Sequence, residues 1–298
     1  MKQNKLIILA SPTGGGKTEL CEHMDSDKFE IVSFDSRQVY KLLEVGTSKP
    51  NEQLRRKIKH HLIDFLEPSL KINAAYFSKL AKEKVENLLS ENKIPILTCG
   101  TGFYLKAFLY GMYQTPPEIP ELRTKIESLN REERWNLLVS QDKDAADAIS
   151  KNDDYRVIRA LEVISQGFLW SRMKERKEGG FLNRSKLEVT GIYIERDRKE
   201  LYQRINLRAK EMVEGMIKET RKVVDKYGKE CPALNSLGYN FALENIMGLI
   251  TIEQFYERLS RSHRNYAKKQ ITWFKSEKIL QSYSWTEALN KIKNTDKW

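Results

Sequence analysis

The sequence is poor in the residues that build disulfide frameworks and metal centres. It holds three well-separated cysteines and four histidines, without the spacing of a metal site. Its longest uninterrupted apolar run, Leu6 to Ala10, is far shorter than the roughly 20 residues that cross a bilayer. These shortages exclude a disulfide-stapled secreted domain and a membrane protein. We therefore expect a cytoplasmic location, no membrane partner and no metal bound by a cysteine and histidine cluster.

Apolar residues are present in ordinary amount, and positive charge is in excess. Hydrophobic residues make up 40% of the 298 positions, which is enough for a sizeable core. The 52 basic and 41 acidic residues give a net charge of +11. Most of the excess lies in residues 196–298, which hold 21 basic and 13 acidic residues. A basic segment of this kind points to a polyanionic partner such as a nucleic acid, although a solvated charged surface has the same composition.

The order of apolar and helical stretches predicts an α/β protein with an insertion. Residues 1–112 alternate the two, which is the pattern of a parallel sheet. After a proline-rich breaker, residues 119–166 have helical spacing. We predict a core over residues 1–112 and 188–298, interrupted by a helical insertion over 113–187; helices that only cover the sheet are the alternative. The expected strands are 5–10, 30–34, 61–63, 94–98 and 188–194.

The strongest motif is a glycine-rich turn between an apolar strand and a helical stretch. Residues 6–20 read LIILASPTGGGKTEL, which is close to the phosphate-loop pattern but has Ser11 in place of its first glycine. Backbone N–H groups of such a loop bind phosphate oxygens, Lys17 reaches the terminal phosphate and the Thr18 hydroxyl holds Mg²⁺. The fold class is therefore a P-loop parallel sheet of the nucleoside-triphosphate-hydrolase type. The predicted phosphate-binding residues are Thr13, Gly14, Gly15, Gly16, Lys17 and Thr18.

Two further strand ends carry reactive side chains. The second strand is followed by Asp35 in IVSFD, and the fourth by Thr101 in LTCGTGFYLKAF. The carboxyl ends of parallel strands face the ligand crevice of such sheets, so both side chains are expected beside the glycine-rich loop. Three roles are open to Asp35: it takes a proton from a nucleophile, lies near Mg²⁺, or caps a helix.

Two long helices are expected after the last strand, over residues 198–226 and from Thr251 onward. In the second, Gln254 lies three residues after Thr251, which is a capping box. At about 100° per residue, the apolar and basic side chains of this helix fall on nearly opposite flanks. The basic flank consists of Arg261, Arg264, Lys268 and Lys275. A solvated face explains it as well as a phosphate-binding surface does.

Taken together and in order, eight motifs resemble the bacterial tRNA dimethylallyltransferases, also called tRNA isopentenyltransferases or the IPP transferase family. The motifs are SPTGGGKT, SFDSRQVY, VGTSKP, HHLID, CGTGFYLKA, RVIRALEV, LGY and KKQITWF, and they extend to about residue 275. The resemblance implies Mg²⁺-dependent transfer of a dimethylallyl group from dimethylallyl diphosphate to N6 of the adenosine that follows the anticodon. It also implies catalytic roles for Asp35 as the base, for Thr101 near the reacting atoms, and for Lys17 and Arg221 on the departing diphosphate.

The resemblance further implies that the anticodon stem-loop of tRNA is the partner, held by a monomer whose insertion clasps it. Proteins read loop bases by stacking and edge hydrogen bonds, while Lys and Arg hold phosphates, so the basic flank becomes a phosphate-binding surface. The matching tRNA positions are Asp35, Ser36, Arg37, Gln38, Thr101, Arg123, Arg156, Arg159, Gly238, Tyr239, Lys268, Lys269, Gln270 and Trp273.

The chain departs from the family pattern at three positions. Ser11 and Cys99 replace glycines, and Asn240 stands where a basic residue usually follows Gly-Tyr, which puts one RNA contact in doubt. Three other functions stay open at this point. They are prenylation of a free nucleotide such as AMP, a small-molecule kinase in which Asp35 activates a hydroxyl, and an RNA-binding protein without catalysis.

Overall fold

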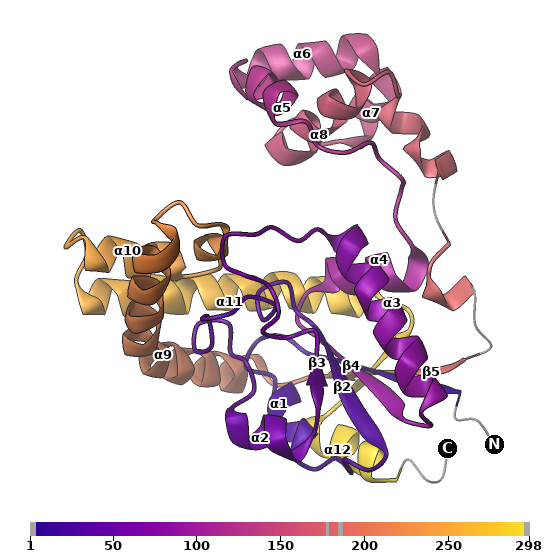
Figure 1. Ribbon diagram of the computed structural model, residues 1–298, viewed down its shortest axis with the longest axis vertical. Helices are drawn as coiled ribbons and strands as arrows, with labels where there is room; N and C mark the ends of the chain where they lie inside the picture. Colours follow the sequence, from indigo (N-terminus) through magenta and orange to yellow (C-terminus); the bar gives the residue numbers. More distant parts are fainter. Residues whose placement is uncertain (1–3, 177–178, 184–186, 295–298) are drawn as a thin grey trace. The chain divides into compact units, whose positions relative to one another are not determined.

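The computed structural model describes residues 4–176, 179–183 and 187–294. The chain divides into two compact units, one formed by residues 1–109 with 185–298 and the other by residues 110–184. Each junction lies three residues before the boundary that the sequence predicts. The first unit holds the sheet and the two longest of the described helices (Figure 1). We call it the sheet unit, and the second the insertion unit.

The described residues of the sheet unit form one six-stranded sheet in the order β3-β2-β4-β1-β5-β6, with every pairing parallel. The strands are β1 Lys5–Ala10, β2 Phe29–Phe34, β3 His60–His61, β4 Ile94–Cys99, β5 Glu188–Ile194 and β6 Leu280–Tyr283. The first five match the expected strands to within two residues. β3 ends early because Leu62 adopts the left-handed backbone region, with φ of 59°. β6 was not predicted, since LQSY is short and has no buried face.

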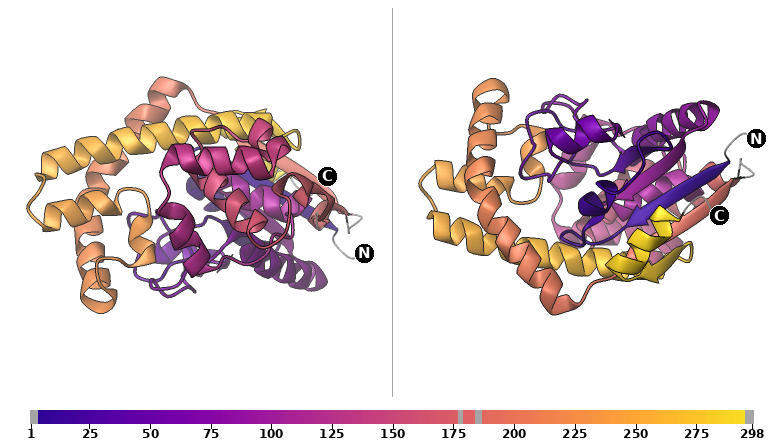
Figure 2. Two further views of the ribbon diagram at one scale, coloured as in Figure 1. Left: turned by 90° about the horizontal axis from the view of Figure 1, so that it is seen from above. Right: turned by 90° about the horizontal axis from the view of Figure 1, so that it is seen from below.

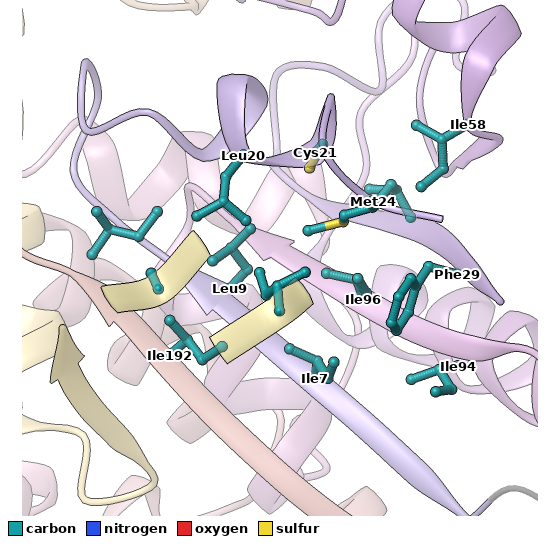
Figure 3. Packing of buried hydrophobic residues seen from close by; sticks show 14 of the residues in the cluster. Ile7, Leu9, Leu20, Cys21, Met24, Phe29, Ile58, Ile94, Ile96 and Ile192 are labelled. Carbon is teal, nitrogen blue, oxygen red and sulfur yellow. The ribbon is translucent and has the colours of Figure 1, made fainter. Parts of the chain in front are cut away.

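One face of the sheet carries a core that reaches from β1 to the last described helix. Ile7 and Leu9 of β1 share this face because strand side chains alternate, and they lie in one cluster with Ile96, Ile192 and Leu20 (Figure 3). This packing holds the chain's first helix against β1. The helices on this face are α1 Lys17–Cys21, α2 Glu52–Lys57 and α12 Trp285–Lys293.

The other face of the sheet is covered by α3, Ala74–Ser90, and α4, Gly102–Tyr110. Phe34 at the end of β2 contacts Phe77 of α3 and Phe108 of α4 edge to face, with ring centroids 5.2 and 5.1 Å apart. These aromatic contacts fix the carboxyl end of β2 immediately before Asp35.

Long helices flank the carboxyl edge of the sheet. They are α9 Arg198–Tyr227, α10 Tyr239–Ile246 and α11 Ile252–Ser276, with the short turn η3 Pro232–Asn235 before α10. Helix α9 packs against both α10 and α11 (Figure 2). It begins at an Asp197 cap and ends at Gly228, where φ is 81°. Thr251 and Gln254 form the predicted capping box of α11.

The insertion unit is helical, as the sequence predicts. Its described elements are α5 Pro120–Glu127, α6 Arg131–Gln141, α7 Lys143–Ala148, α8 Asp154–Ile164, η1 Trp170–Arg176 and η2 Phe181–Asn183. It has its own apolar core, in which Leu138 of α6 and Leu161 of α8 are fully buried. Across both units, the described helices include none with enough length and hydropathy to traverse a bilayer.

Candidate active site

The turn between β1 and α1 leaves backbone N–H groups free to bind an anion. Gly14 and Gly16 hold positive φ angles of 78° and 99°, which glycine adopts readily. The N–H groups of Gly14, Gly16, Lys17 and Thr18 make no hydrogen bond among the described residues. Alternation between right- and left-handed backbone directs such groups toward one point, where they form a nest for a phosphate. The turn has the form of a phosphate loop.

Lys17 reaches back across this loop from the start of α1. Its Nζ donates to the carbonyl oxygen of Ser11 at 2.8 Å and to Ser11 Oγ at 3.1 Å. Burial lowers the pKa of Lys17 to about 8, and the nearby Asp35 carboxylate opposes part of that decrease. Ser11, which replaces the usual glycine, therefore supplies a second acceptor that holds the ammonium at the loop.

The lowered pKa predicts that affinity for inorganic diphosphate falls above about pH 8. Only the ammonium form attracts the anion, so above this pH the free protein must take up a proton as it binds. Each further pH unit then weakens binding by up to about tenfold. Calorimetric titration with Mg²⁺ and diphosphate from about pH 6.5 to about pH 9.5 measures the decrease. The Lys17→Arg protein stays charged and corrects for the ligand's own ionisation; parallel curves would contradict the prediction.

Asp35 presents one carboxylate oxygen to the crevice and uses the other to hold its own turn. Oδ1 accepts hydrogen bonds from the N–H groups of Arg37, at 2.8 Å, and Gln38, at 3.4 Å. Oδ2 makes no hydrogen bond among the described residues, and it lies so close to Gly100 that a Cβ there would overlap it. The capping role and a free proton acceptor thus coexist in one side chain.

Thr101 lies beside Asp35 because the ends of β2 and β4 are paired. Its Oγ1 accepts from the Ser36 N–H at 3.2 Å and is 3.4 Å from Ser36 Oγ. A cavity opens between these strand ends and the glycine-rich loop. Its lining residues are Lys17, Thr18, Cys21, Ser33, Asp35, Gln38, Pro50, His60, Thr98 and Gly100. The loop cation and the candidate base therefore face one space.

Arg208, which the sequence did not single out, is the arginine that the structure places at this site. It lies on α9, half-buried, near Asp35 and Lys17, and makes no hydrogen bond or ion pair among the described residues. Burial lowers the pKa of Arg208, while the Asp35 carboxylate opposes the change. Arg221 is exposed and lies about 20 Å further along α9, at about 1.5 Å per residue. Arg208, and not the predicted Arg221, is therefore the one of these two α9 arginines that lies near Lys17 and Asp35.

Two of the residues predicted to contact RNA on α11 instead hold the active-site turns together. Gln270 is buried, its Oε1 accepts from the Thr13 N–H at 2.8 Å, and its Nε2 donates to the Gly100 oxygen at 2.8 Å. The amide thus joins the glycine-rich loop to the end of β4. The ring of Trp273 lies against Gly102, where a Cβ would overlap it. Both side chains therefore contact the turns that surround the cavity without lining it.

Gln38 also has an internal role. Its Oε1 accepts from Ser33 Oγ at 2.8 Å, and its Nε2 donates to the carbonyl oxygens of Thr47 and Ser48 at 3.3 and 3.0 Å. These bonds fasten the segment after Asp35 to the VGTSKP loop.

Tyr239 is fully buried, so its ring is not accessible to an RNA partner in this structure. Its hydroxyl donates to Glu219 Oε2 at 2.7 Å. The same buried carboxylate accepts the N–H groups of Glu44, Val45 and Gly46, at 2.8, 2.6 and 3.3 Å. Burial and the Glu219 carboxylate raise the pKa of Tyr239 well above its ordinary value. The LGY turn, with Gly238 at φ of 89°, therefore anchors the VGTSKP loop through this hydroxyl.

The basic flank of α11 is only partly free. Arg264 bonds an asparagine of α9 at 2.5 Å, and Lys275 pairs with a glutamate after β5 at 2.5 Å. Arg261, Lys268 and Lys269 are exposed and make no ion pair among the described residues. The exposed, unpaired cations of α11 are therefore Arg261 and Lys268 of the flank and the neighbouring Lys269.

The three predicted arginines of the insertion unit differ in accessibility. Arg159 is 9% exposed, pairs with Glu162 at 2.9 Å and donates to Thr115 Oγ1 at 3.1 Å, so it holds α8 to the proline-rich segment. Arg123 lies among three glutamates, at 2.9 to 3.7 Å. Arg156 is exposed and pairs with an aspartate one turn earlier at 3.3 Å. Of these three side chains, that of Arg156 is the most exposed.

The oxygen donors at the loop fit a hard cation that is held mainly by the oxygens of a bound phosphate. No group of three or more His, Cys, Asp or Glu in the described part of the chain could bind a metal. The Thr18 hydroxyl makes no hydrogen bond there either. Mg²⁺ commonly takes one or two protein oxygens and fills its octahedron with phosphate oxygens and waters. One hydroxyl beside a phosphate loop fits this requirement for protein oxygens.

Comparisons with known proteins place the chain in one family. A family model described as IPP transferase matches residues 38–277. The tRNA dimethylallyltransferase of Leptospira interrogans is 47% identical over 291 residues, covering 97% of this chain and 98% of that protein. That of Leptospira biflexa is 45% identical over 292 residues, covering 98% and 99%.

Solved structures agree in fold. The tRNA Δ2-isopentenylpyrophosphate transferase of Staphylococcus epidermidis superposes with a TM-score of 0.68 at 30% identity, covering 99% of both chains. A eukaryotic dimethylallyltransferase acting on tRNA superposes with a TM-score of 0.80 at 24% identity, covering 99% of this chain and 77% of that one. The glycine-rich loop, the crevice carboxylate and these matches lead to one assignment: this chain belongs to the IPP transferase family.

Proposed function

We propose that the protein transfers a dimethylallyl group from dimethylallyl diphosphate to N6 of the adenosine that follows the anticodon in tRNA. One observation carries this proposal: the ammonium of Lys17 and the carboxylate of Asp35 line the same cavity. Lys17 can bind an anion at one end of that cavity, and Asp35 can accept a proton at the other. An amine that attacks a diphosphate ester needs both, because the diphosphate leaves as an anion and the amine loses a proton. The relatives described above supply the identity of the two substrates.

The chemistry balances with the groups on hand. A bond forms between adenosine N6 and C1 of the dimethylallyl group, while the bond from C1 to the diphosphate oxygen breaks. An exocyclic adenine amine is a weak nucleophile, so its proton must pass to a positioned acceptor, and the free Oδ2 of Asp35 takes it. The Thr101 hydroxyl, next to Asp35, orients the amine or the bridging oxygen.

Negative charge collects on the departing diphosphate and needs donors that are already in place. Lys17 Nζ, Arg208 and four loop N–H groups would meet that need. The four N–H groups belong to Gly14, Gly16, Lys17 and Thr18, which have no other backbone acceptor among the described residues. Mg²⁺, held by Thr18 and the diphosphate, would neutralise part of the same charge. No ATP is required, because the phosphate loop serves the prenyl diphosphate itself.

The tRNA would be held by the exposed cations of α11, by Ser36 and Arg37 after the base, and by Arg123 and Arg156 of the insertion unit. We further propose that the protein acts as a monomer in the cytoplasm. A basic face and an insertion are what a large polyanion needs and a free nucleotide does not, which favours tRNA over AMP. A kinase would need an ATP-clamping lid, and a purely RNA-binding protein would need neither Lys17 nor a free Asp35 oxygen.

A transfer assay tests the proposal. Purified protein, Mg²⁺ and radiolabelled dimethylallyl diphosphate are offered unmodified tRNA and AMP in parallel, with Lys17→Ala protein as the inactive control. Label on tRNA alone supports the assignment. Label on AMP means a nucleotide prenyltransferase, and consumption of added ATP with no label on either acceptor overturns the assignment in favour of a kinase.

Neutralising the exposed, unpaired cations of α11 should weaken tRNA binding and reduce its salt dependence. Each phosphate contact contributes about 0.7 to 0.9 to the slope of log K against log salt, so the triple change of Arg261, Lys268 and Lys269 to glutamine lowers the slope by about 2 to 3. Filter binding between about 50 and about 200 mM salt measures it. A control triple variant, Lys79, Lys82 and Lys84 of α3 to glutamine, should keep the original slope. Equal slopes for both triple variants would mean that these α11 cations form an ordinary solvated surface.

A further inference from the structure

The outer side of the phosphate loop is held by two arginines that the reaction itself does not use. Arg204 of α9 donates from Nε to the carbonyl oxygen of Gly14 at 2.9 Å. Arg196, which follows β5, donates from Nε to the carbonyl oxygen of Gly15 at 2.9 Å. The carbonyl oxygens of two consecutive peptide groups of the loop therefore each accept a hydrogen bond from an arginine.

Hydrogen bonds to these carbonyl oxygens fix the direction of the N–H groups on the other side of the same peptide groups. In a trans peptide the carbonyl and the following N–H point in opposite directions. Holding the Gly15 oxygen outward therefore turns the Gly16 N–H to the side of the free N–H groups of Lys17 and Thr18. Holding the Gly14 oxygen outward turns the Gly15 N–H toward the Pro12 oxygen, to which it donates at 3.0 Å, and so closes the turn. Glycine restrains its backbone weakly, so a loop of three glycines needs such external bonds to keep one conformation before an anion arrives.

The charges on the two arginines are already balanced. Arg204 forms an ion pair with Glu19, and Arg196 pairs with Glu200 and, at 3.8 Å, with Glu19. The guanidinium groups therefore add little net attraction for an anion. Their contribution is to orient the peptide groups of the loop. A planar guanidinium can bond a carbonyl through Nε and a carboxylate through its other nitrogens at once. Its donors are spread over three nitrogens in a fixed plane, whereas those of a lysine all belong to one nitrogen.

Trp285 completes this outer support from the far end of the chain. It begins α12, beyond the matched residues 38–277, and packs onto the core under the sheet. Its ring lies 5.9 Å from the Arg196 guanidinium and so close to Gly16 that a Cβ there would be 2.9 Å away. The indole N–H is buried and has no hydrogen-bond partner in the described part of the chain, so Trp285 contributes here through the packing of its ring.

We propose that Arg196, Arg204 and Trp285 form a collar that sets the phosphate loop in its anion-binding conformation, and that they are positioning residues for the diphosphate. The collar lies on the outer side of the loop and touches neither the amine nor the allylic carbon. The inference rests on the proposed function for the identity of the prenyl substrate. Its binding test uses inorganic diphosphate and does not depend on that function.

Calorimetry of the full-length protein with Mg²⁺ and inorganic diphosphate tests the collar. We expect Arg196→Lys and Arg204→Lys each to weaken binding about tenfold, the loss of one oriented hydrogen bond near a charge. Arg198→Lys is the matched control, because Arg198 begins the same helix, stacks on Tyr202 and does not contact the loop. Trp285→Phe keeps a ring over Arg196 and should bind within about twofold of the parent, whereas Trp285→Ala weakens binding.

Two readouts separate a positioning role from general support of the fold. In the transfer assay the KM for dimethylallyl diphosphate rises in the two collar lysine variants while the KM for tRNA and the thermal midpoint stay unchanged. Diphosphate affinity equal to the parent in both lysine variants overturns the proposal, as does a tRNA KM that rises equally. If the parent binds diphosphate but transfers no label, the proposed function fails while the collar is still tested by calorimetry.

Discussion

We expect Asp35→Asn protein to transfer the dimethylallyl group at least ~100-fold more slowly than the parent, with tRNA affinity changed by less than about twofold. Asparagine keeps an oxygen in the place of Oδ1, so it can still accept the N–H groups of Arg37 and Gln38 that hold the turn. It replaces the free Oδ2 by an NH₂ group, which cannot take a proton. The rate falls because the base is lost, not because the turn is lost.

Single-turnover transfer with saturating tRNA and dimethylallyl diphosphate measures the rate, and filter binding measures affinity. Asp35→Ala removes both the cap and the base and serves as the comparison. If asparagine and alanine differ greatly in rate, the cap matters more than proton transfer. An asparagine variant with a near-parental rate removes Asp35 as the base.

Arg208→Gln should lower the transfer rate by at least ~100-fold, the usual loss for one donor that meets developing charge in a site shielded from water. The guanidinium lies near Asp35 and Lys17 without a hydrogen-bond partner among the described residues, so a diphosphate can engage it without displacing another group. Arg208→Lys keeps the charge but not the planar donor array, and should recover only part of the rate.

Arg221→Gln is the matched control, on the same helix and with the same chemical change. Arg221 is exposed and lies away from the loop, so its loss should leave the rate within about twofold. Rates for both variants come from the same assay with dimethylallyl diphosphate varied. A large loss for Arg221 with little for Arg208 would reverse the assignment made from the structure.

Local sequence was sufficient for the elements that depend on neighbours in the chain. Four of the first five strands, β1, β2, β4 and β5, were predictable because each is a short, largely apolar run bounded by turn residues. Helix α11 was predictable because its capping box lies within four residues. The glycine-rich loop and the position of Asp35 at a strand end also follow from local order. The eight motifs led to the family, which the matches to relatives confirm.

Tertiary structure alone decided which side chains face the site and which support it. Helical spacing could not distinguish Arg208 from Arg221, because the choice depends on where α9 passes the glycine-rich loop. Gln270 and Tyr239 carry polar groups that an exposed position would offer to RNA, yet packing buries both and uses those groups internally. The short strand β6 exists because the edge of β5 was free to pair with it, although its own residues hardly favour a strand. Such contacts join residues far apart in the chain, and no local pattern contains them.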